Sequence, residues 1–345
     1  MWKRLIPVAL ALALLALGCG PAAAPSPAPP LAATRASDPW SQVPQIVDPA
    51  NHGWPRSVRS VTGPVELKRK PERILVLSLG HEEMSLALVP PSRLVGTSQW
   101  TINAALSNVV ELARAIPVLP SSAEAYIAAR PELVVVTPYT RRELIQQLTD
   151  AGMPVFLTEV TETPLYYERD LLLLAYLLGE EERALEVMRT VQGRRQRIER
   201  ALATKPAGER PTVLSLSGQN FTGGSGTSNE SIIAAAGGVN AATKAGVEGW
   251  HQISLEAIAQ MDPDYVLLST DDPANPELPA QLFAHPAFTG LRAFKERERR
   301  IINIPSRYLS TLSFWNIRGI EELARALWPQ DFAGVEFRDF DFRRE

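Results

Sequence analysis

A long helix-forming stretch near the middle of the chain places the strongest constraint on the fold. Residues 165–205 contain no proline, and we expect Gly179 to be the one break in the helix. From Glu180 to Leu202, a continuous α-helix would be about 34 Å long at 1.5 Å per residue. That length matches the width of a small domain. The stretch therefore predicts one long, rigid helix joining two lobes, and we expect the lobes to close little around a ligand.

Short apolar segments alternate with helix-forming segments on both sides of that stretch. Apolar runs of this length are typical of strands buried in a parallel sheet. We therefore expect an α/β fold of two Rossmann-like lobes with parallel-sheet cores, and a ligand cleft between the lobes at the carboxyl ends of the strands. The expected strands are residues 65–68, 74–78, 94–96, 131–136, 154–157, 211–216, 265–269 and 300–304, and the expected helices are residues 82–88, 121–129, 142–151, 228–236, 255–260, 280–285, 291–296 and 319–327.

The same pattern predicts the organisation of the chain. Prolines before the first lobe exclude a long helix there, and a Pro/Ala-rich stretch is typical of an extended linker. The last residues mix phenylalanine with charge, and we expect them to be loosely packed. The predicted parts are a linker and irregular segment (20–60), an N-terminal lobe (61–164), the interlobe helix (165–205), a C-terminal lobe (206–330) and a tail (331–345).

The N-terminus has the three parts of a secretory signal. Residues 1–4 are basic at Lys3 and Arg4, residues 5–17 are apolar, and a small residue precedes Cys19. The apolar part is shorter than the roughly 20 residues that a membrane span needs. The ending Ala16-Leu17-Gly18-Cys19 resembles the lipobox of bacterial lipoproteins, although that family usually has Leu at the position of Ala16. The resemblance implies a signal peptide (1–19) and a lipid on Cys19.

We therefore expect a protein anchored by lipid to the extracytoplasmic face of a cell membrane. The alternative is an ordinary signal peptide with an incidental cysteine. Cys19 is the only cysteine of the chain, so there is no internal disulfide. The net charge is −3, and no basic block of the kind that binds nucleic acid is present.

Four stretches of the sequence resemble a known family, the helical-backbone solute-binding proteins of ATP-driven importers for ferric siderophores, haem and cobalamin. They span about residues 62–328 in the order that the family has. The resemblance implies a ferric siderophore as ligand, with cobalamin or haem as alternatives. It also implies a permease dimer with its ATPase subunits as partner, a monomeric state and no cofactor. The four stretches are residues 71–78 with Glu83, residues 131–135, residues 232–240 and residues 249–268.

The family likeness also implies one carboxylate on the outer rim of each lobe, pairing with arginines of the permease. Matching places these carboxylates at Glu83 and Glu256, and a carboxylate–arginine pair is bidentate and orienting. The alternative is that each is a glutamate favoured near a helix N-terminus by the macrodipole.

Residues near strand ends are candidates for the cleft, where aromatic and a few polar side chains suit a bulky, planar or macrocyclic ligand. Arginines there suit the charge of a siderophore or of haem propionates. His81, His251 and Tyr308 are also candidate ligands of haem iron. No other metal site is expected, since no cluster has metal-ligand spacing. The ligand-binding candidates are His81, Gln99, Trp100, Tyr139, Arg141, Asn220, Phe221, Trp250, His251, Asp271, Arg307, Tyr308 and Trp315.

The sequence leaves two other classes of protein as alternatives. An exported α/β hydrolase would need a Gly-x-Ser-x-Gly elbow, but the segment around Ser225 lacks the final glycine, and the last histidine, His285, precedes a proline. We therefore expect no enzymatic activity. A lipid-anchored adhesion or scaffold module of the same fold, with a cleft that binds nothing, is the third possibility.

Overall fold

The computed structural model describes residues 38–159, 167–269, 280, 284–288, 290–296 and 300–342. Residues from Asp38 onward form one compact unit. The predicted signal peptide, Cys19 and Asp271 lie outside the described residues, as do residues 281–283 of the helix expected at 280–285. Among the described helices, none is both long enough and apolar enough to cross a membrane.

The N-terminal lobe is built on a four-stranded parallel sheet in the order β4-β3-β5-β6. Ile74 lies opposite both Leu94 and Leu133, so the central strand pairs on both sides. All three residues of β3 and all four of β5 are buried. The strands are β3 (Ile74–Val76), β4 (Leu94–Gly96), β5 (Leu133–Val136) and β6 (Val155–Leu157), at each position where the sequence predicts a strand.

The helices of this lobe follow the strands. The predicted cap at Ser122 is confirmed, since its side chain accepts a hydrogen bond from the backbone N–H of Ala125. The first helix begins at Leu79, three residues earlier than expected, after Ser78 in an extended conformation. The helices are α1 (Leu79–Leu88), α2 (Val110–Ala113), α3 (Ala123–Ala128) and α4 (Arg142–Asp150), with a 3-10 turn at Pro91–Arg93.

A hairpin precedes this sheet. Strand β1 (Arg56–Ser60) pairs antiparallel with β2 (Gly63–Leu67), after a 3-10 turn at Pro39–Gln42. The sequence predicts the second strand but not the first, because Val58 is the only apolar residue in β1. Val58 pairs with Val65, and both are buried.

The long helical stretch contains two helices. They are α5 (Tyr167–Leu178) and α6 (Glu181–Leu202), which break at Gly179 as predicted. Gly179 has φ +70°, a left-handed conformation that favours glycine at a helix end. Helix α6 has 22 residues and keeps the long continuous helix that the sequence predicts.

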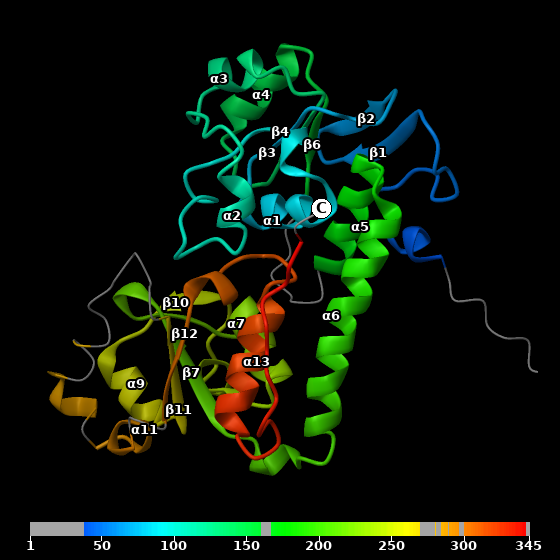
Figure 1. The fold of residues 1–345 in the computed structure, drawn as a ribbon. Helices are drawn as coiled ribbons and strands as arrows, with labels where there is room; N and C mark the ends of the chain where they lie inside the picture. Colours follow the sequence, from blue (N-terminus) through cyan, green and yellow to red (C-terminus); the bar gives the residue numbers. More distant parts are fainter. Residues whose placement is uncertain are drawn as a thin grey trace, which may run out of the picture. The chain divides into compact units, whose positions relative to one another are not determined.

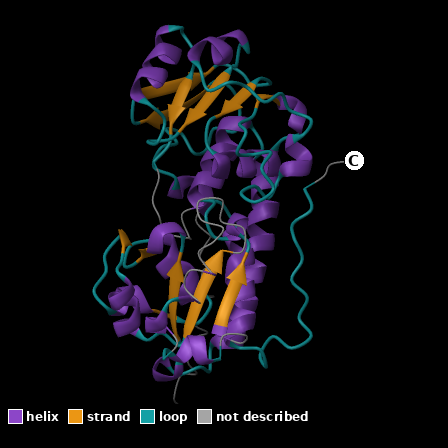
Figure 2. Ribbon diagram, turned by 90° about the vertical axis from the view of Figure 1, so that its left-hand side faces the viewer, coloured by secondary structure: helices purple, strands orange, loops and turns teal. Residues whose placement is uncertain are grey.

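The C-terminal lobe has a second four-stranded parallel sheet, in the order β12-β11-β7-β9. Strands β8 and β10, which lie between β7 and β11 in the chain, form a separate antiparallel ribbon. Figure 2 shows the two parallel sheets in separate halves with helices around them, so the prediction of two α/β lobes is confirmed. The strands are β7 (Thr212–Leu216), β8 (Phe221–Gly223), β9 (Val239–Asn240), β10 (Trp250–Gln252), β11 (Tyr265–Ser269) and β12 (Ile301–Ile304); the helices are α7 (Ser228–Ala235), α8 (Ala241–Lys244), α9 (Leu255–Met261), α11 (Arg292–Lys295) and α13 (Asn316–Leu327); and 3-10 turns span Ala207–Glu209, Gly218–Asn220, Pro286–Phe288 and Ser306–Tyr308.

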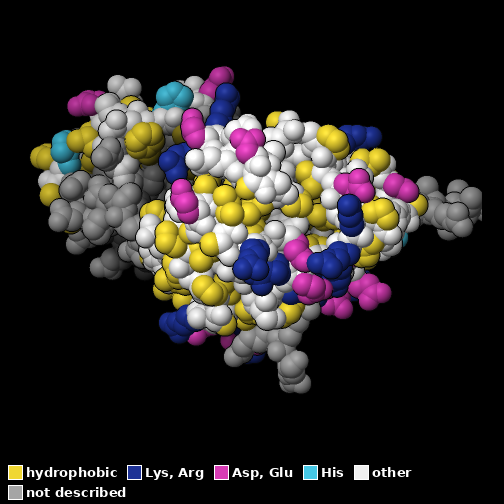
Figure 3. Space-filling view, turned by 90° about the horizontal axis from the view of Figure 1, so that it is seen from above, with side chains coloured by type: hydrophobic (Ala, Val, Ile, Leu, Met, Phe, Trp, Pro, Cys, Tyr) yellow, Lys and Arg dark blue, Asp and Glu magenta, His cyan; other side chains and the backbone are white. Residues whose placement is uncertain are grey.

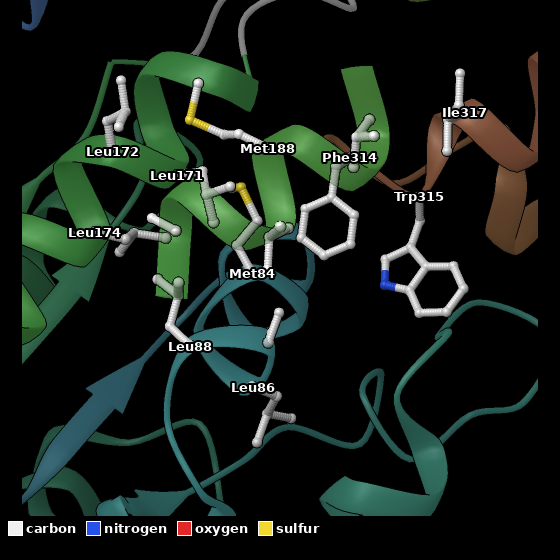
Figure 4. Close-up of a cluster of buried hydrophobic side chains, with 14 of the residues drawn as sticks. Met84, Leu86, Leu88, Leu171, Leu172, Leu174, Met188, Phe314, Trp315 and Ile317 are labelled. Atoms are coloured by element: carbon white, nitrogen blue, oxygen red, sulfur yellow. The ribbon is translucent and has the colours of Figure 1, made fainter. Parts of the chain in front are cut away.

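One hydrophobic core continues from the first sheet through α1, α5 and α6 to the second sheet and α13. Figure 4 shows its middle, where Met84 of α1 and Leu171 of α5 lie near Phe314. Phe314 is completely buried. A core shared by both lobes supports the expectation that the lobes close little, which stays a prediction.

The prediction of a loosely packed tail is wrong for the part that the structure describes. Phe332 and Phe337 are buried, and Phe340 and Phe342 pack edge-on against Phe314. Asp339 accepts a hydrogen bond from Arg318 at 2.9 Å. Figure 1 shows this segment running back along α13. The phenylalanines find partners that are close in space but distant in sequence.

Candidate functional site

A hollow of about 640 Å³ lies at the carboxyl ends of the N-lobe strands. Ser78 follows β3, Ser98 follows β4 and Thr137 follows β5, and each lines the hollow. Trp100 and Tyr139 form its aromatic walls and are 54% and 73% exposed. This position agrees with the rule that open parallel sheets bind ligands at the carboxyl ends of their strands.

A second hollow, of about 440 Å³, lies at the corresponding end of the C-lobe sheet. Ser217 follows β7 and Ser269 ends β11, and both line it together with Trp250 of β10. Tyr139 lines this hollow as well as the first one. The two hollows therefore adjoin, and we call them together the cleft.

The electrostatic character of the cleft favours a negative ligand. Among the described residues that line it, Arg141 is the one charged side chain. The N-terminal ends of α1, α4 and α7 also border the cleft, at Ser78, Arg141 and Ser228. Helix N-termini present unpaired N–H groups and a partial positive charge. Serine and threonine hydroxyls complete a lining that can donate many hydrogen bonds.

Five of the predicted ligand residues line the cleft: Gln99, Trp100, Tyr139, Arg141 and Trp250. Their position in the cleft agrees with the sequence-based expectation, and their role in ligand binding stays a prediction.

Three more predicted residues lie in or beside the ribbon that carries Trp250. His251 pairs with Thr222, and Gln252 pairs with Phe221. His251 is exposed, Phe221 is 40% exposed, and Asn220 precedes the ribbon with φ +59°. None of the three lines either hollow, so their role in ligand binding stays a prediction.

Two of the three candidate haem-iron ligands are buried, which contradicts their placement in the cleft. His81 is 2% exposed because α1 begins early enough to include it, and its Nε2 lies 3.5 Å from an Asp170 oxygen. Tyr308 is 5% exposed and donates a hydrogen bond of 2.6 Å to Asp339. Of the three candidates, only His251 has an exposed side chain.

Arg307 and Trp315 also lie outside the cleft. They line another hollow, of about 550 Å³, bordered by α2 and by the tail. Trp315 is 2% exposed. The Arg307 guanidinium lies 3.4 Å from the Ala104 carbonyl oxygen and 3.3 Å from the Tyr308 hydroxyl. Their placement in the cleft is therefore wrong.

The rim position expected for Glu83 is wrong as well. Its side chain has no exposed surface. Glu83 Oε1 accepts hydrogen bonds of 2.8 Å from both the backbone N–H and the side-chain amide of Asn108, and Oε2 accepts one of 2.6 Å from Ser313. Burial raises its pKa to about 7 against the lowering effect of these donors. A carboxylate in this position has no surface to offer to a permease arginine.

Glu256, in contrast, is exposed in the first turn of α9. A hydrogen bond from its own backbone N–H and one from Ser254 lower its pKa, so it is ionised at neutral pH. Ser254 caps the helix by accepting a hydrogen bond from the Ala257 N–H. Glu256 therefore fits the rim carboxylate that the sequence predicts for the C-terminal lobe.

Sequence reasoning missed its counterpart in the N-terminal lobe, Glu124. Residues 122–136 repeat residues 254–268, both with Ser-x-Glu-Ala at the start and proline nine positions after the first serine. Glu124 is exposed in the first turn of α3, behind the cap Ser122, and the same two kinds of hydrogen bond lower its pKa. A search for internal repeats would have found it.

The backbone confirms that the two segments are equivalent. Arg130 and Asp262, at matched positions before the two prolines, both have a positive φ, +47° and +35°. This conformation is uncommon outside glycine, and its recurrence at the same position is a specific likeness. The two exposed glutamates therefore occupy corresponding places in the two lobes.

Comparison with known proteins identifies the family. A family model described as periplasmic binding protein matches residues 74–308, well over half of the chain. The chain therefore belongs to the periplasmic binding protein family, and the resemblance to helical-backbone solute-binding proteins is confirmed. The hydrolase alternative is wrong, because this is a family of binding proteins and not of enzymes.

One curated relative is the molybdate-binding protein MolA of Haemophilus influenzae, which is 23% identical over 236 residues. The match covers 62% of this chain and 65% of the relative, so the chain spans slightly less than two thirds of that protein.

Three solved structures illustrate the fold. The structure of MolA bound to molybdate has a TM-score of 0.69 at 21% identity, covering 81% of this chain and 94% of that chain. The periplasmic heme-binding protein RhuT from Roseiflexus sp. RS-1, in apo form, has a TM-score of 0.65 at 23% identity, covering 75% of this chain and 99% of that chain. The heme-binding protein BhuT in complex with two hemes has a TM-score of 0.62 at 23% identity, covering 74% of this chain and 98% of that chain.

Proposed function

We propose that this protein is the extracytoplasmic substrate-binding protein of an ABC importer, held at the membrane by a lipid on Cys19. Membership of the periplasmic binding protein family supports the role, and the lipobox-like sequence supports the anchor. A tether of this kind raises the effective concentration of the loaded protein near its permease.

The ligand that we propose is a bulky organic anion that carries a metal, with a ferric siderophore as the first candidate. The observation that carries this proposal is the lining of the cleft: one arginine, many hydroxyls, two tryptophans and two tyrosines, without a carboxylate among the described lining residues. Hollows of about 640 and 440 Å³ lie in the range for organic ligands. A bare oxyanion such as molybdate would leave most of this space and the aromatic walls unused.

Haem is the second candidate, and cobalamin would use the same cleft. RhuT and BhuT, which share the fold, are named as heme-binding proteins. Tyr139 and His251 are both exposed, and tyrosine and histidine are side chains that can hold haem iron. Haem binding through Tyr139 would produce a Soret absorption band that a siderophore complex lacks.

Replacing Arg141 with glutamine is expected to weaken ligand binding at least tenfold, because Arg141 is the one charged group among the described residues that line the cleft. Removing a charge-assisted hydrogen bond from a bound anion costs about 1.5–3 kcal/mol. The dissociation constant is measured by titrating the tryptophan fluorescence with ferric catecholate and hydroxamate siderophores, hemin, cyanocobalamin and molybdate. Arg142→Gln is the matched control, since Arg142 is exposed on the same helix and does not line the cleft. Equal affinities for the two variants would contradict the assignment.

We further propose that Glu124 and Glu256 are the rim carboxylates that contact permease arginines. The matched positions in the repeat and their shared exposure support this pair. Glu124 replaces Glu83, whose burial excludes the role.

Charge reversal at both rim positions, Glu124→Lys with Glu256→Lys, is expected to abolish ligand uptake by cells that carry the cognate importer. Each single variant should retain part of the uptake, since one carboxylate remains. Ligand affinity should stay unchanged in all three variants, because neither residue lines the cleft. Glu143→Lys, another exposed glutamate in a first helical turn, serves as the control. Normal uptake by the double variant would rule out this docking pair.

A further inference from the structure

Two adjacent carboxylates, Glu82 and Glu83, are completely buried in α1. Neither lines the cleft, and neither reaches the surface. Burying a charged group without cause is costly, and each of these carboxylates has a set of hydrogen-bond donors around it. The donors of the two residues come from different parts of the molecule.

Glu82 holds the turn that follows β4. Its Oε1 accepts a hydrogen bond of 3.0 Å from Thr97, and its Oε2 accepts hydrogen bonds from Thr101 and, at 3.5 Å, from Ser98. The two residues between Ser98 and Thr101 are Gln99 and Trp100, which line the cleft. Glu82 therefore fixes the ends of the turn that forms one aromatic wall.

Glu83 joins the two lobes. Besides the two hydrogen bonds from Asn108 of the N-terminal lobe, it accepts one from Ser313 of the segment that leads into α13. The Asn108 amide also donates a hydrogen bond of 2.8 Å to the carbonyl oxygen of Arg307 in the same C-lobe segment. Two bonds from two residues thus attach that segment to α1 and its neighbouring loop.

The attached segment forms part of the opposite wall. Leu309, Ser310 and Leu312 line the C-lobe hollow, and Leu312 directly precedes Ser313. The contact with α1 is close, because a Cβ added at Gly80 would lie 2.6 Å from the carbonyl oxygen of Leu312. Position 80 must therefore lack a side chain for α1 and this wall to meet.

We propose that Glu82 and Glu83 are positioning residues that set the two walls of the cleft relative to α1, Glu82 through the turn at 97–101 and Glu83 through the segment at 306–313. The proposal rests on the proposed function only in treating the cleft as the ligand site. Other charged groups nearby are occupied elsewhere: Asp170 of α5 faces His81, and the Arg307 guanidinium faces Ala104 and Tyr308.

Hydrogen–deuterium exchange of the ligand-free, full-length protein tests the proposal through four variants. Glu82→Leu should raise exchange at least tenfold in residues 97–101, and Glu83→Leu should do so in residues 107–109 and 309–314. Glu82→Gln and Glu83→Gln should stay within threefold of wild type, because an amide keeps the acceptor oxygen and the hydroxyl partners can reverse their hydrogen bonds. Rescue by the isosteric amide separates positioning from loss of volume.

Two internal references keep the result interpretable. Strands β7 and β11 report on global opening. Ser85→Ala alters a buried side chain of α1 whose hydroxyl has no hydrogen-bond partner among the described residues. If a leucine variant does not fold, the comparison of its glutamine variant between pH 6 and pH 8 remains. After correction for the intrinsic rise of amide exchange with pH, we expect unchanged protection in both walls, and a loss of protection in either wall would overturn the proposal. The proposal is overturned if the leucine variants exchange like wild type in the walls, or if exchange rises equally in β7 and β11. Since no ligand is present, either outcome is independent of which ligand the cleft takes.

Discussion

Replacing Phe314 with alanine is expected to lower the free energy of unfolding by about 3–5 kcal/mol, the cost of truncating a fully buried phenylalanine. Phe314 is completely buried. Its ring lies edge-on to Tyr167, Phe340 and Phe342 and stacks with Trp315. Urea denaturation followed by circular dichroism measures the loss.

The position of Phe314 makes the effect larger than that of an ordinary core residue. The ring joins α5 to the tail and lies in the core that continues through both lobes, so the cavity would open where three elements meet. Aromatic pairs add about 0.5–1.5 kcal/mol beyond the buried area. Phe221→Ala is the control, since Phe221 is 40% exposed and should change stability little. A loss below about 1 kcal/mol for Phe314→Ala would mean that the tail does not pack there in solution.

The sequence carried enough information for the strands and for most of the cleft. Runs such as Ile74–Val76 and Leu133–Val136 are apolar throughout because both faces of a parallel strand are covered. Once the strands are known, the rule for open sheets leads to Gln99, Trp100 and Tyr139. Local chemistry also predicted the cap at Ser122 and the helix break at Gly179.

The candidates that were placed wrongly depend on contacts between distant parts of the chain. Glu83 follows a histidine and a glutamate, a sequence typical of a surface, yet its Ser313 partner is 230 residues away. Tyr308 and Trp315 are buried by a tail whose Asp339 and Phe340 contact them. No local pattern specifies such contacts, because the periodicity of a segment shows which face is apolar but not what covers it.

The stability of the protein is expected to fall as the pH rises from 5 to 8, by about 2 kcal/mol for each of the two buried carboxylates of α1. Burial raises the pKa of Glu82 and of Glu83 from 4.5 to about 7. Between these values the folded protein binds more protons than the unfolded chain, so a rise in pH favours unfolding. Below about pH 4.5 and above about pH 7 these groups contribute no further slope. Urea denaturation at pH 5, 6, 7 and 8 measures the free energy of unfolding.

Glutamine at either position should remove the part of this pH dependence that the residue contributes, because an amide does not ionise and its burial carries no charge penalty. Glu82→Gln and Glu83→Gln are therefore each expected to be more stable than wild type at pH 8 and to show a shallower pH profile, with the double variant nearly flat. Glu124→Gln is the control: hydrogen bonds lower the pKa of Glu124, so its titration lies below this window and the slope should stay that of wild type. If the glutamine variants kept the wild-type slope, the two carboxylates would have to titrate near their ordinary pKa. Hydrogen bonds from Thr97 and Thr101 to Glu82, and from Asn108 and Ser313 to Glu83, would then fully offset the cost of burial.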